Sequence, residues 1–324
     1  MMKRNYSVFL GNVGSCSDRY CPEYTKPFST AELFDRVAEI PLIRGVDLVA
    51  SPGLLEDREI VRHKLREHKL RAVSVAADTF TQARWKQGSF SAPDSEIRKQ
   101  AMIHAEETIE FAKELECSLV TFWPGQDGYD YLFQADYEAE RDFFIDALKT
   151  LCAKHPETTF ALEYKMKEPR THSYLNTVAM TVLFCQAAGP NCKAIIDFGH
   201  ALLGYENPAE SVAVLHRFGN LLKHIHINDN FRLWDDDMIV GSVHTLEYLE
   251  FFYWLRRTGY DGWFVIDQFP YREDGRDAVA ESAEWLDFLE SVMDRADMEE
   301  IGNTLKHKDA NAASKLMRKL LKNA

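Results

Sequence analysis

The sequence lacks several features that would place it in a particular class of protein. No window approaches the ~20 consecutive apolar residues that a membrane-spanning helix requires, so we expect no membrane partner. The first residues, Met-Met-Lys-Arg-Asn-Tyr, precede no apolar core or cleavage site, which predicts that there is no secretory signal. The six cysteines form no Cys-x-x-Cys pair and no regular framework; they are Cys16, Cys21, Cys117, Cys152, Cys185 and Cys192. Such a pattern is typical of free thiols in a reducing compartment, so a soluble, cytoplasmic protein is expected.

Positive charge is also scarce. The 324 residues include 38 lysines and arginines against 51 aspartates and glutamates, which gives a net charge of −13. Nucleic-acid binding needs a cationic surface that meets the phosphate backbone, so this balance argues against a nucleic-acid partner. The hydrophobic content of 46% is ample for a large buried core, and α/β barrels of this length commonly form one domain.

Short apolar runs alternate with longer amphipathic segments along most of the chain. The runs predict strands at residues 6–10, 45–49, 71–77, 118–123, 158–165, 193–198, 221–228 and 263–269. Helical patterns lie near residues 29–39, 56–68, 94–116, 136–154, 172–188, 208–217, 244–257 and 276–293. Eight such units favour an α/β fold with a parallel sheet, the closed (β/α)8 TIM barrel. A doubly wound open sheet is the alternative, although the turn at residues 11–15 lacks the third glycine of a dinucleotide-binding loop.

The last part of the chain differs from the rest. We predict that residues 1–293 form the barrel and that residues 294–324 form a C-terminal helical tail. The tail is charged and carries Leu305, Leu316, Leu320 and Leu321 along one or two short helices. It is either a solvated end or an arm that packs on a neighbouring subunit, and the second interpretation predicts a homo-oligomer.

Acidic and imidazole side chains stand at the ends of the last four predicted strands. Because the carboxyl ends of barrel strands converge on one site, we expect these side chains to meet. Buried like charges repel one another and are costly to desolvate, so such a set is expected to surround a cation. The set contains Glu163 and Lys165 on the fifth strand, Asp197 and His200 at the sixth, His226 on the seventh and Asp267 on the eighth.

The seventh strand leads into a segment that is rich in possible ligands. His224, His226 and Asn228 alternate with isoleucines, which is the period of a strand with one polar face. Three carboxylates, Asp235 to Asp237, follow in the next loop. Imidazole together with carboxylate suits a hard or borderline divalent cation. His224 lies one pair earlier in the strand than His226, so we assign it a structural or supporting role.

These motifs resemble those of the xylose isomerase-like barrel superfamily. Residues 163–169, Glu-Tyr-Lys-Met-Lys-Glu-Pro, are similar to the Glu-x-Lys-x-x-Glu-Pro signature of xylose and L-rhamnose isomerases. Residues 197–200, Asp-Phe-Gly-His, resemble their acid-x-x-His motif, and residues 226–229 with Asp235 to Asp237 resemble the L-rhamnose isomerase pattern. Residues 123–129 resemble a tryptophan-glycine loop that packs on substrate. The resemblance covers about residues 5–293, the whole predicted barrel.

The resemblance implies two divalent metals and a sugar substrate. Mn²⁺ is the first expectation, with Co²⁺, Mg²⁺ or Zn²⁺ as alternatives. Metal 1 would be bound by Glu163, Asp197, His226 and Asp267, and metal 2 by His200, Asp235 and Asp237, with Asp197 bridging. Catalytic roles would belong to Lys165, Glu163 and Asp267, and substrate contacts to Trp123, His200, Glu168 and Asn228.

The sequence also departs from the xylose isomerase pattern. Those enzymes carry a ring-opening histidine near the end of the second or third strand, whereas here these strands end at residues 49–52 and 77–79 without one. An acyclic or already open substrate is therefore expected.

The leading interpretation is an enzyme that interconverts an aldose and a ketose by a metal-assisted hydride shift. The alternatives are a keto-sugar epimerase, a sugar lyase or dehydratase (a class with enzymes that cleave C-glycosides among its members), and a sugar-binding module without turnover. The endonuclease branch of the superfamily is disfavoured, because this chain is acidic and lacks the extra histidines on early strands.

Overall fold

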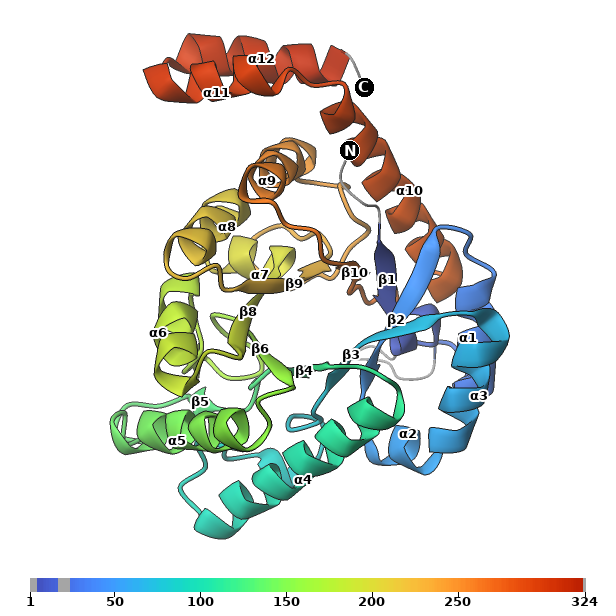
Figure 1. The fold of residues 1–324 in the computed structure, drawn as a ribbon, viewed down its shortest axis with the longest axis vertical. Helices are drawn as coiled ribbons and strands as arrows, with labels where there is room; N and C mark the ends of the chain where they lie inside the picture. The colour runs from blue at the N-terminus through green and yellow to red at the C-terminus, as the bar shows by residue number, and fades with distance from the viewer. Residues whose placement is uncertain (1–4, 17–23, 323–324) are drawn as a thin grey trace.

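The protein is a closed parallel barrel surrounded by helices (Figure 1). The computed structural model describes residues 5–16 and 24–322. Hydrogen-bonded neighbours follow the order β1-β10-β9-β8-β6-β4-β3-β2, and the ring closes between β1 and β2. This confirms the predicted TIM barrel and excludes the open sheet. The barrel strands are β1 (Tyr6–Phe9), β2 (Ile43–Val49), β3 (Arg71–Ala76), β4 (Leu119–Phe122), β6 (Thr159–Glu163), β8 (Cys192–Asp197), β9 (Leu222–Ile227) and β10 (Phe264–Ile266).

A helix follows each barrel strand and covers the outside of the barrel (Figure 1). Ser, Thr, Asp or Asn side chains cap the first turns of most of these helices, as at Ser29, Asp94 and Thr177, and so satisfy backbone N–H groups. The helices are α1 (Thr30–Ala38), α3 (Arg58–His68), α4 (Ser95–Glu114), α5 (Ala139–Lys154), α6 (Val178–Ala188), α8 (Pro208–Arg217), α9 (Thr245–Thr258) and α10 (Gly275–Asp294).

Besides the 3-10 helices at residues 10–13 and 83–85, four short elements lie among the loops at the carboxyl ends of the strands. The sequence periodicity did not predict them, because segments of two to six residues are too short to show a helix or strand pattern. The segment at 172–173 forms a strand rather than the start of a helix. These elements are α2 (Pro52–Glu56), α7 (Phe198–Leu203) and the antiparallel pair β5 (Gly128–Tyr129) and β7 (His172–Ser173).

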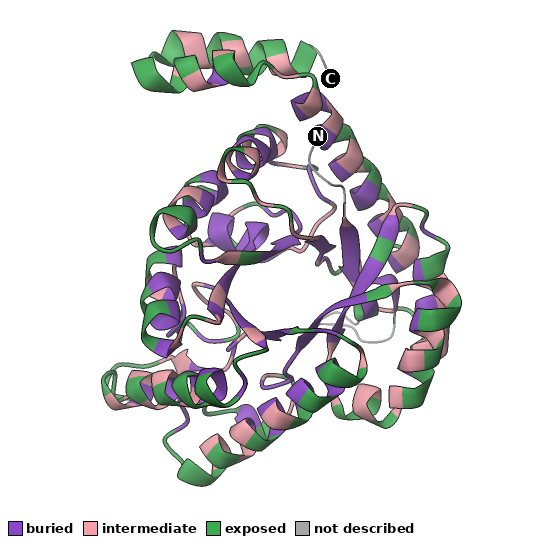
Figure 2. Ribbon diagram, in the orientation of Figure 1, coloured by how far each residue is buried: buried purple, intermediate pink, exposed green. Residues whose placement is uncertain are grey.

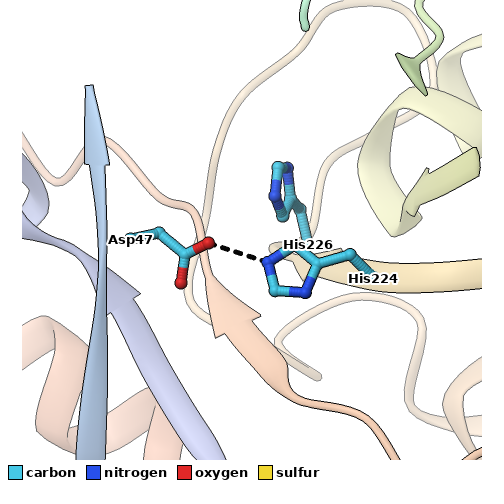
Figure 3. Close-up of side chains that lie close together, drawn as sticks. All are labelled: Asp47, His224 and His226. Atoms are coloured by element: carbon cyan, nitrogen blue, oxygen red, sulfur yellow. Dashed lines mark hydrogen bonds and ion pairs between the residues drawn. The ribbon is translucent and has the colours of Figure 1, made fainter. Parts of the chain in front are cut away.

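The strands are buried on both faces, as expected of a parallel sheet covered by helices (Figure 2). Their outer apolar residues pack against the helices. Some buried polar side chains belong to the strands, and among these Asp47 and His224 point toward each other inside the barrel (Figure 3). Cys16, Cys117, Cys152, Cys185 and Cys192 are free, and Cys21 lies outside the described residues. No helix in the described part of the chain is long and apolar enough to cross a membrane.

Two further helices, α11 (Met298–His307) and α12 (Ala310–Lys322), follow α10 and confirm the C-terminal helical extension. They pair with each other and project from the end of α10, beyond the ring of barrel helices (Figure 1). Leu316 and Leu320 pack against the core, but Leu305, Met317 and Leu321 are exposed. Thus α12 has an amphipathic sequence and no fully buried residue.

We predict that this arm contacts a second copy of the chain. Deleting residues 298–324 should lower the number of chains in each particle, because exposed leucines on an amphipathic helix are stabilised by a partner surface. Sedimentation equilibrium of the full chain and the truncated chain measures this, with circular dichroism to confirm that the barrel remains folded. An unchanged number of chains in each particle would show that the arm is a solvated end.

Candidate metal centre

Four predicted ligands come together at the mouth of the barrel. Glu163 ends β6, Asp197 ends β8, His226 lies in β9 and Asp267 directly follows β10. Each offers one ligand atom, and these atoms all lie within 4.8 Å of one another. The register explains the proximity, since Asp197 pairs with His226 between β8 and β9, and His226 pairs with Val265 between β9 and β10.

The geometry of this group fits a cation. His226 Nδ1 lies 3.1 Å from Glu163 Oε2 and 3.7 Å from Asp267 Oδ2. Nevertheless, neither imidazole nitrogen of His226 has a hydrogen-bond partner, although the side chain is fully buried. Buried polar atoms are normally paired, so carboxylate oxygens and an unpaired imidazole nitrogen around one point are the donor set of a divalent metal.

A second group adjoins the first. His200, in the first turn of α7, lies 3.2 Å from Glu163 through Nδ1 and 3.1 Å from Asp235 Oδ2 through Nε2. The backbone N–H of His200 donates to Asp197 Oδ1, so the N-cap of α7 fixes both residues. Asp235 Oδ1 and His200 Nδ1 have no hydrogen-bond partner. Asp237 lines the same cavity as these residues, so the structure places the predicted second ligand set beside the first.

Lys165 supplies the positive charge of this region. Its Nζ lies 2.7 Å from Asp235 Oδ2 and 3.3 Å from Glu168 Oε2, and all three side chains are largely buried. The ammonium also lies 5.4 Å from the centroid of the Trp123 ring. Burial would lower the pKa of Lys165, but the carboxylates, Asp235 first, outweigh burial and raise it. Lys165 is therefore a permanent cation that faces the cavity.

Burial and crowding also shift the pKa values of the ligands. Burial alone would lower the pKa of His226, but the carboxylates of Glu163 and Asp267 outweigh it and raise that pKa to about 9. Burial raises the pKa of Asp267 to about 8, an effect that His226 opposes and Glu163 reinforces. The pKa of Asp197 rises to about 6, with burial again the main cause. Near neutral pH, His226 and Asp267 therefore hold protons that a bound cation would displace, whereas at Glu163 burial is outweighed by the two histidines that face it, which lower its pKa.

Two predicted substrate contacts lie in different positions. Trp123 lines the cavity, and its ring meets Phe80 edge-on at 4.7 Å between centroids. Asn228 instead is fully buried against Asp197, to which its Nδ2 donates at 3.1 and 3.3 Å. We therefore interpret Asn228 as a residue that orients a ligand. The strand period placed it on the polar face, but it did not show that its amide bonds Asp197 and that the side chain does not line the cavity.

A hydrogen-bonded layer lies beneath the candidate metal centre, and sequence reasoning missed most of it. His224 Nε2 lies 2.7 Å from Asp47 Oδ2 (Figure 3). The Asp47 carboxylate also accepts bonds from Ser7 and Ser74. Because Asp47 is saturated by these donors, we interpret the group of Asp47, His224 and His226 as a support rather than a further ion site. The available signal was a lone aspartate inside the apolar strand β2.

Both groups open into one large cavity of about 920 Å³. Glu163, Lys165, His200 and Asp267 form part of its wall, together with Asp235 to Asp237. The volume lies near the upper end of the range of ~300–1,000 Å³ for sites that enclose a small ligand. The site can therefore hold an organic molecule against the carboxylates.

Comparison with known proteins agrees with this geometry. The model of the xylose isomerase-like TIM barrel family matches residues 31–289. The chain belongs to this family. It is 26% identical over 285 residues to a xylose isomerase of Thermus thermophilus, an alignment that covers 83% of this chain and 73% of that protein. It is 27% identical over 246 residues to a probable sugar isomerase of Rhizobium meliloti. That alignment covers 71% of this chain and 56% of the relative, so the chain spans little more than half the length of that protein.

Solved structures show the same fold. A D-tagatose 3-epimerase-like protein superposes with a TM-score of 0.69 at 18% identity, over 89% of this chain and 98% of that chain. A 3-keto-D-glucoside 4-epimerase of E. coli superposes with a TM-score of 0.66 at 18% identity, over 89% of this chain and 100% of the other. At these identities the likeness establishes the barrel and not the reaction.

We predict that divalent cations stabilise the fold through this centre. Mn²⁺ at about a hundred times its dissociation constant should add about 2.7 kcal/mol to the free energy of unfolding, which raises the Tm by roughly 5 °C. Glu163→Gln should abolish the shift. The matched control is His68→Gln, which disrupts an exposed group of Asp35, Glu67 and His68. Equal shifts in both variants would indicate binding outside the barrel mouth.

We also predict that Mn²⁺ binding weakens as the pH falls. The pKa of His226 is raised to about 9, so at neutral pH its imidazole carries a proton that a cation must displace. The dissociation constant should therefore rise by roughly tenfold per pH unit just below about 9, and more steeply below about 8, where Asp267 also binds a proton. Calorimetry in two buffers with different ionisation enthalpies measures the released protons directly. A dissociation constant that is independent of pH would contradict this assignment.

Proposed function

We propose that the protein is a divalent-metal-dependent sugar isomerase that interconverts an aldose and a ketose. The observation that carries the proposal is the pair of adjacent ligand groups, which face one cavity together with the buried ammonium of Lys165. The first group comprises Glu163, Asp197, His226 and Asp267. The second comprises His200, Asp235 and Asp237, and Asp197, which interacts electrostatically with members of both groups, would bridge them.

The donor set favours Mn²⁺, Co²⁺ or Mg²⁺ over a soft metal that prefers thiolate ligands, because it consists of carboxylate oxygens with one or two imidazoles. When bound, such cations polarise a carbonyl group and lower the pKa of a neighbouring hydroxyl. Asn228, through Asp197, and the α7 N-cap, through His200, keep the ligands oriented. Supports of this kind commonly affect metal affinity strongly.

Lys165 has the position of an electrostatic donor. Its ammonium lies on the cavity wall between Trp123 and Asp235, and its raised pKa keeps it charged. A substrate oxygen that gains negative charge beside it would accept a hydrogen bond from Nζ. Trp123 and Phe80 form an apolar wall next to the ammonium, which excludes water and strengthens that bond.

A one-metal keto-sugar epimerase is the second candidate, and one observation favours it. Lys165 and His200 already neutralise Asp235 without any cation, so the second ligand group is satisfied in part by its own ion pairs. In an epimerase, Glu163 and Asp267 would act as acid and base on one substrate carbon. The raised pKa of Asp267, about 8, allows it to hold a proton near neutral pH.

The role of Lys165 predicts a large kinetic effect. Lys165→Met removes the ammonium while keeping most of the side-chain volume, and kcat should fall by about 10²-fold or more. Lys165→Arg should restore little of the rate, because a planar guanidinium cannot place a single donor at the same point. Lys167→Met, a neighbour that bonds the Leu233 carbonyl, is the control. A loss of thermal stability with unchanged kcat would make Lys165 a structural counter-ion.

The isomerase and epimerase candidates move hydrogen differently. A hydride shift keeps the migrating hydrogen on the substrate, whereas a carboxylate base exchanges it with solvent. We expect single-turnover reactions in D₂O to leave C1 and C2 of the product free of deuterium. Mass spectrometry of the product from a panel of tetroses to hexoses with Mn²⁺ measures this. Stoichiometric deuterium would refute the shift and favour Glu163 or Asp267 as the base.

A further inference from the structure

The cavity has a second region that the metal chemistry does not use. Away from the carboxylates, its wall includes Phe28, just before α1, Leu33 in α1 and Leu54 in α2. Leu33 and Leu54 pack on the core with one side and are only partly buried, so each leaves apolar surface toward the cavity. Exposed apolar surface inside a ligand cavity is typical of a binding wall.

This apolar region is held in place. The Phe28 ring lies under the guanidinium of Arg36, 4.4 Å from the ring centroid. Arg36 is itself fixed by the Val13 carbonyl at 2.6 Å and by Asp274 at 2.7 Å. A wall held by such contacts keeps its shape before a ligand arrives, which lowers the entropy cost of binding.

Three hydroxyl side chains near this wall, Ser29, Thr30 and Ser51, already make hydrogen bonds. Ser29 bonds Glu32, and Thr30 donates to Asp57 at 2.5 Å. Ser51 accepts from the Leu54 backbone as the N-cap of α2. These contacts make the side chains poor receptors for the hydroxyls of a second sugar ring, which needs polar groups that are free to bond. The region thus favours an apolar group over a further carbohydrate unit.

The charge of the cavity disfavours an anionic group. Among the described residues that line it, Lys165 is the one lysine or arginine, and it is ion-paired with Asp235. Apart from His200, whose pKa is raised against the effect of burial by the carboxylates around it, the other charged residues of the wall are acidic, including Asp57. Phosphate recognition normally uses arginine, lysine or free helix N-termini. A phosphate at the apolar region would meet Asp57 and no lysine or arginine of the described lining.

We propose that the substrate is a sugar that carries a neutral apolar substituent, such as an aryl or alkyl ether or ester, at the end remote from the reacting carbons. This inference rests on the proposed function, which places the reacting carbons at the carboxylates. The substituent lies against Phe28, Leu33 and Leu54. The cavity, with a volume of about 920 Å³, is large enough to hold both the sugar and its substituent.

Binding of acyclic analogues tests the proposal without requiring turnover. Xylitol, ribitol, D-arabinitol and D-glucitol are titrated into the Mn²⁺-loaded full chain by calorimetry, each as the free polyol, its terminal benzyl ether and its terminal phosphate. At least one benzyl ether should bind about tenfold or more tightly than its parent, since an aryl group buries a large apolar area, and the phosphates should bind more weakly. If no benzyl ether gains affinity, or if a phosphate binds most tightly, the proposal is overturned.

Two variants locate the gain. Leu33→Asn and Leu54→Asn should reduce the ratio of affinities between benzyl ether and free polyol to near one. Leu183→Asn, on the outer face of α6 with 59% exposure, should leave the ratio unchanged. Because the readout is a ratio in a protein whose folding is checked by its Tm, a general loss of stability does not imitate the result. An unchanged ratio in both cavity variants would overturn the assignment of the wall.

The outcome remains separate from that of the proposed function. If the benzyl ethers bind tightly but no free or substituted aldose is isomerised, the isomerase assignment fails while the apolar subsite stands. If free aldoses are isomerised but the benzyl ethers gain nothing, the isomerase assignment stands and the subsite fails.

Discussion

The concentration of carboxylates at one end of the barrel is the constraint on which the rest of the structure depends. Glu163, Asp197 and Asp267 are brought together by strands that cannot separate without opening the ring, and the loop after β9 adds Asp235 and Asp237. Each buried ion costs several kcal/mol to desolvate, and two imidazoles and Lys165 compensate for part of this. The result is a region with excess negative charge, and its pKa values are raised where compensation is weakest, at Asp267 and Asp237.

Two layers of polar residues inside the barrel solve the same problem in different ways. In the lower layer, Asp47 is saturated by His224, Ser7 and Ser74, so its charge is stabilised by the protein alone. In the upper layer, neither nitrogen of His226 makes a hydrogen bond, although Nδ1 faces the carboxylates of Glu163 and Asp267. The lower layer can therefore serve as a rigid floor, while the upper layer retains the capacity to bind. Phe9, which lines the cavity, meets the His226 ring edge-on at 5.0 Å between centroids.

Much of the fold could be predicted from local patterns, because strand and helix periods are properties of the sequence. The exceptions are instructive. The eighth strand is shorter than its apolar run, since β10 ends at Ile266 and Asp267 already lies in the site loop. Residues 172–173 pair with 128–129 across the chain instead of starting a helix. Both outcomes depend on partners that are distant in sequence, so no local pattern contains them.

The sequence by itself determined which strand ends carry ligand chemistry, because alternation with a period of two places Glu163, Asp197 and His226 on defined faces. Only the tertiary structure decided how these groups meet. Closure of the ring sets the register that pairs Asp197 with His226 and turns Asn228 toward Asp197. The same closure brings Asp47 into contact with His224. It also brings Phe28, Leu33 and Leu54 to the same cavity as the carboxylates. Such contacts link residues far apart in the chain, and their geometry follows from packing of the whole barrel.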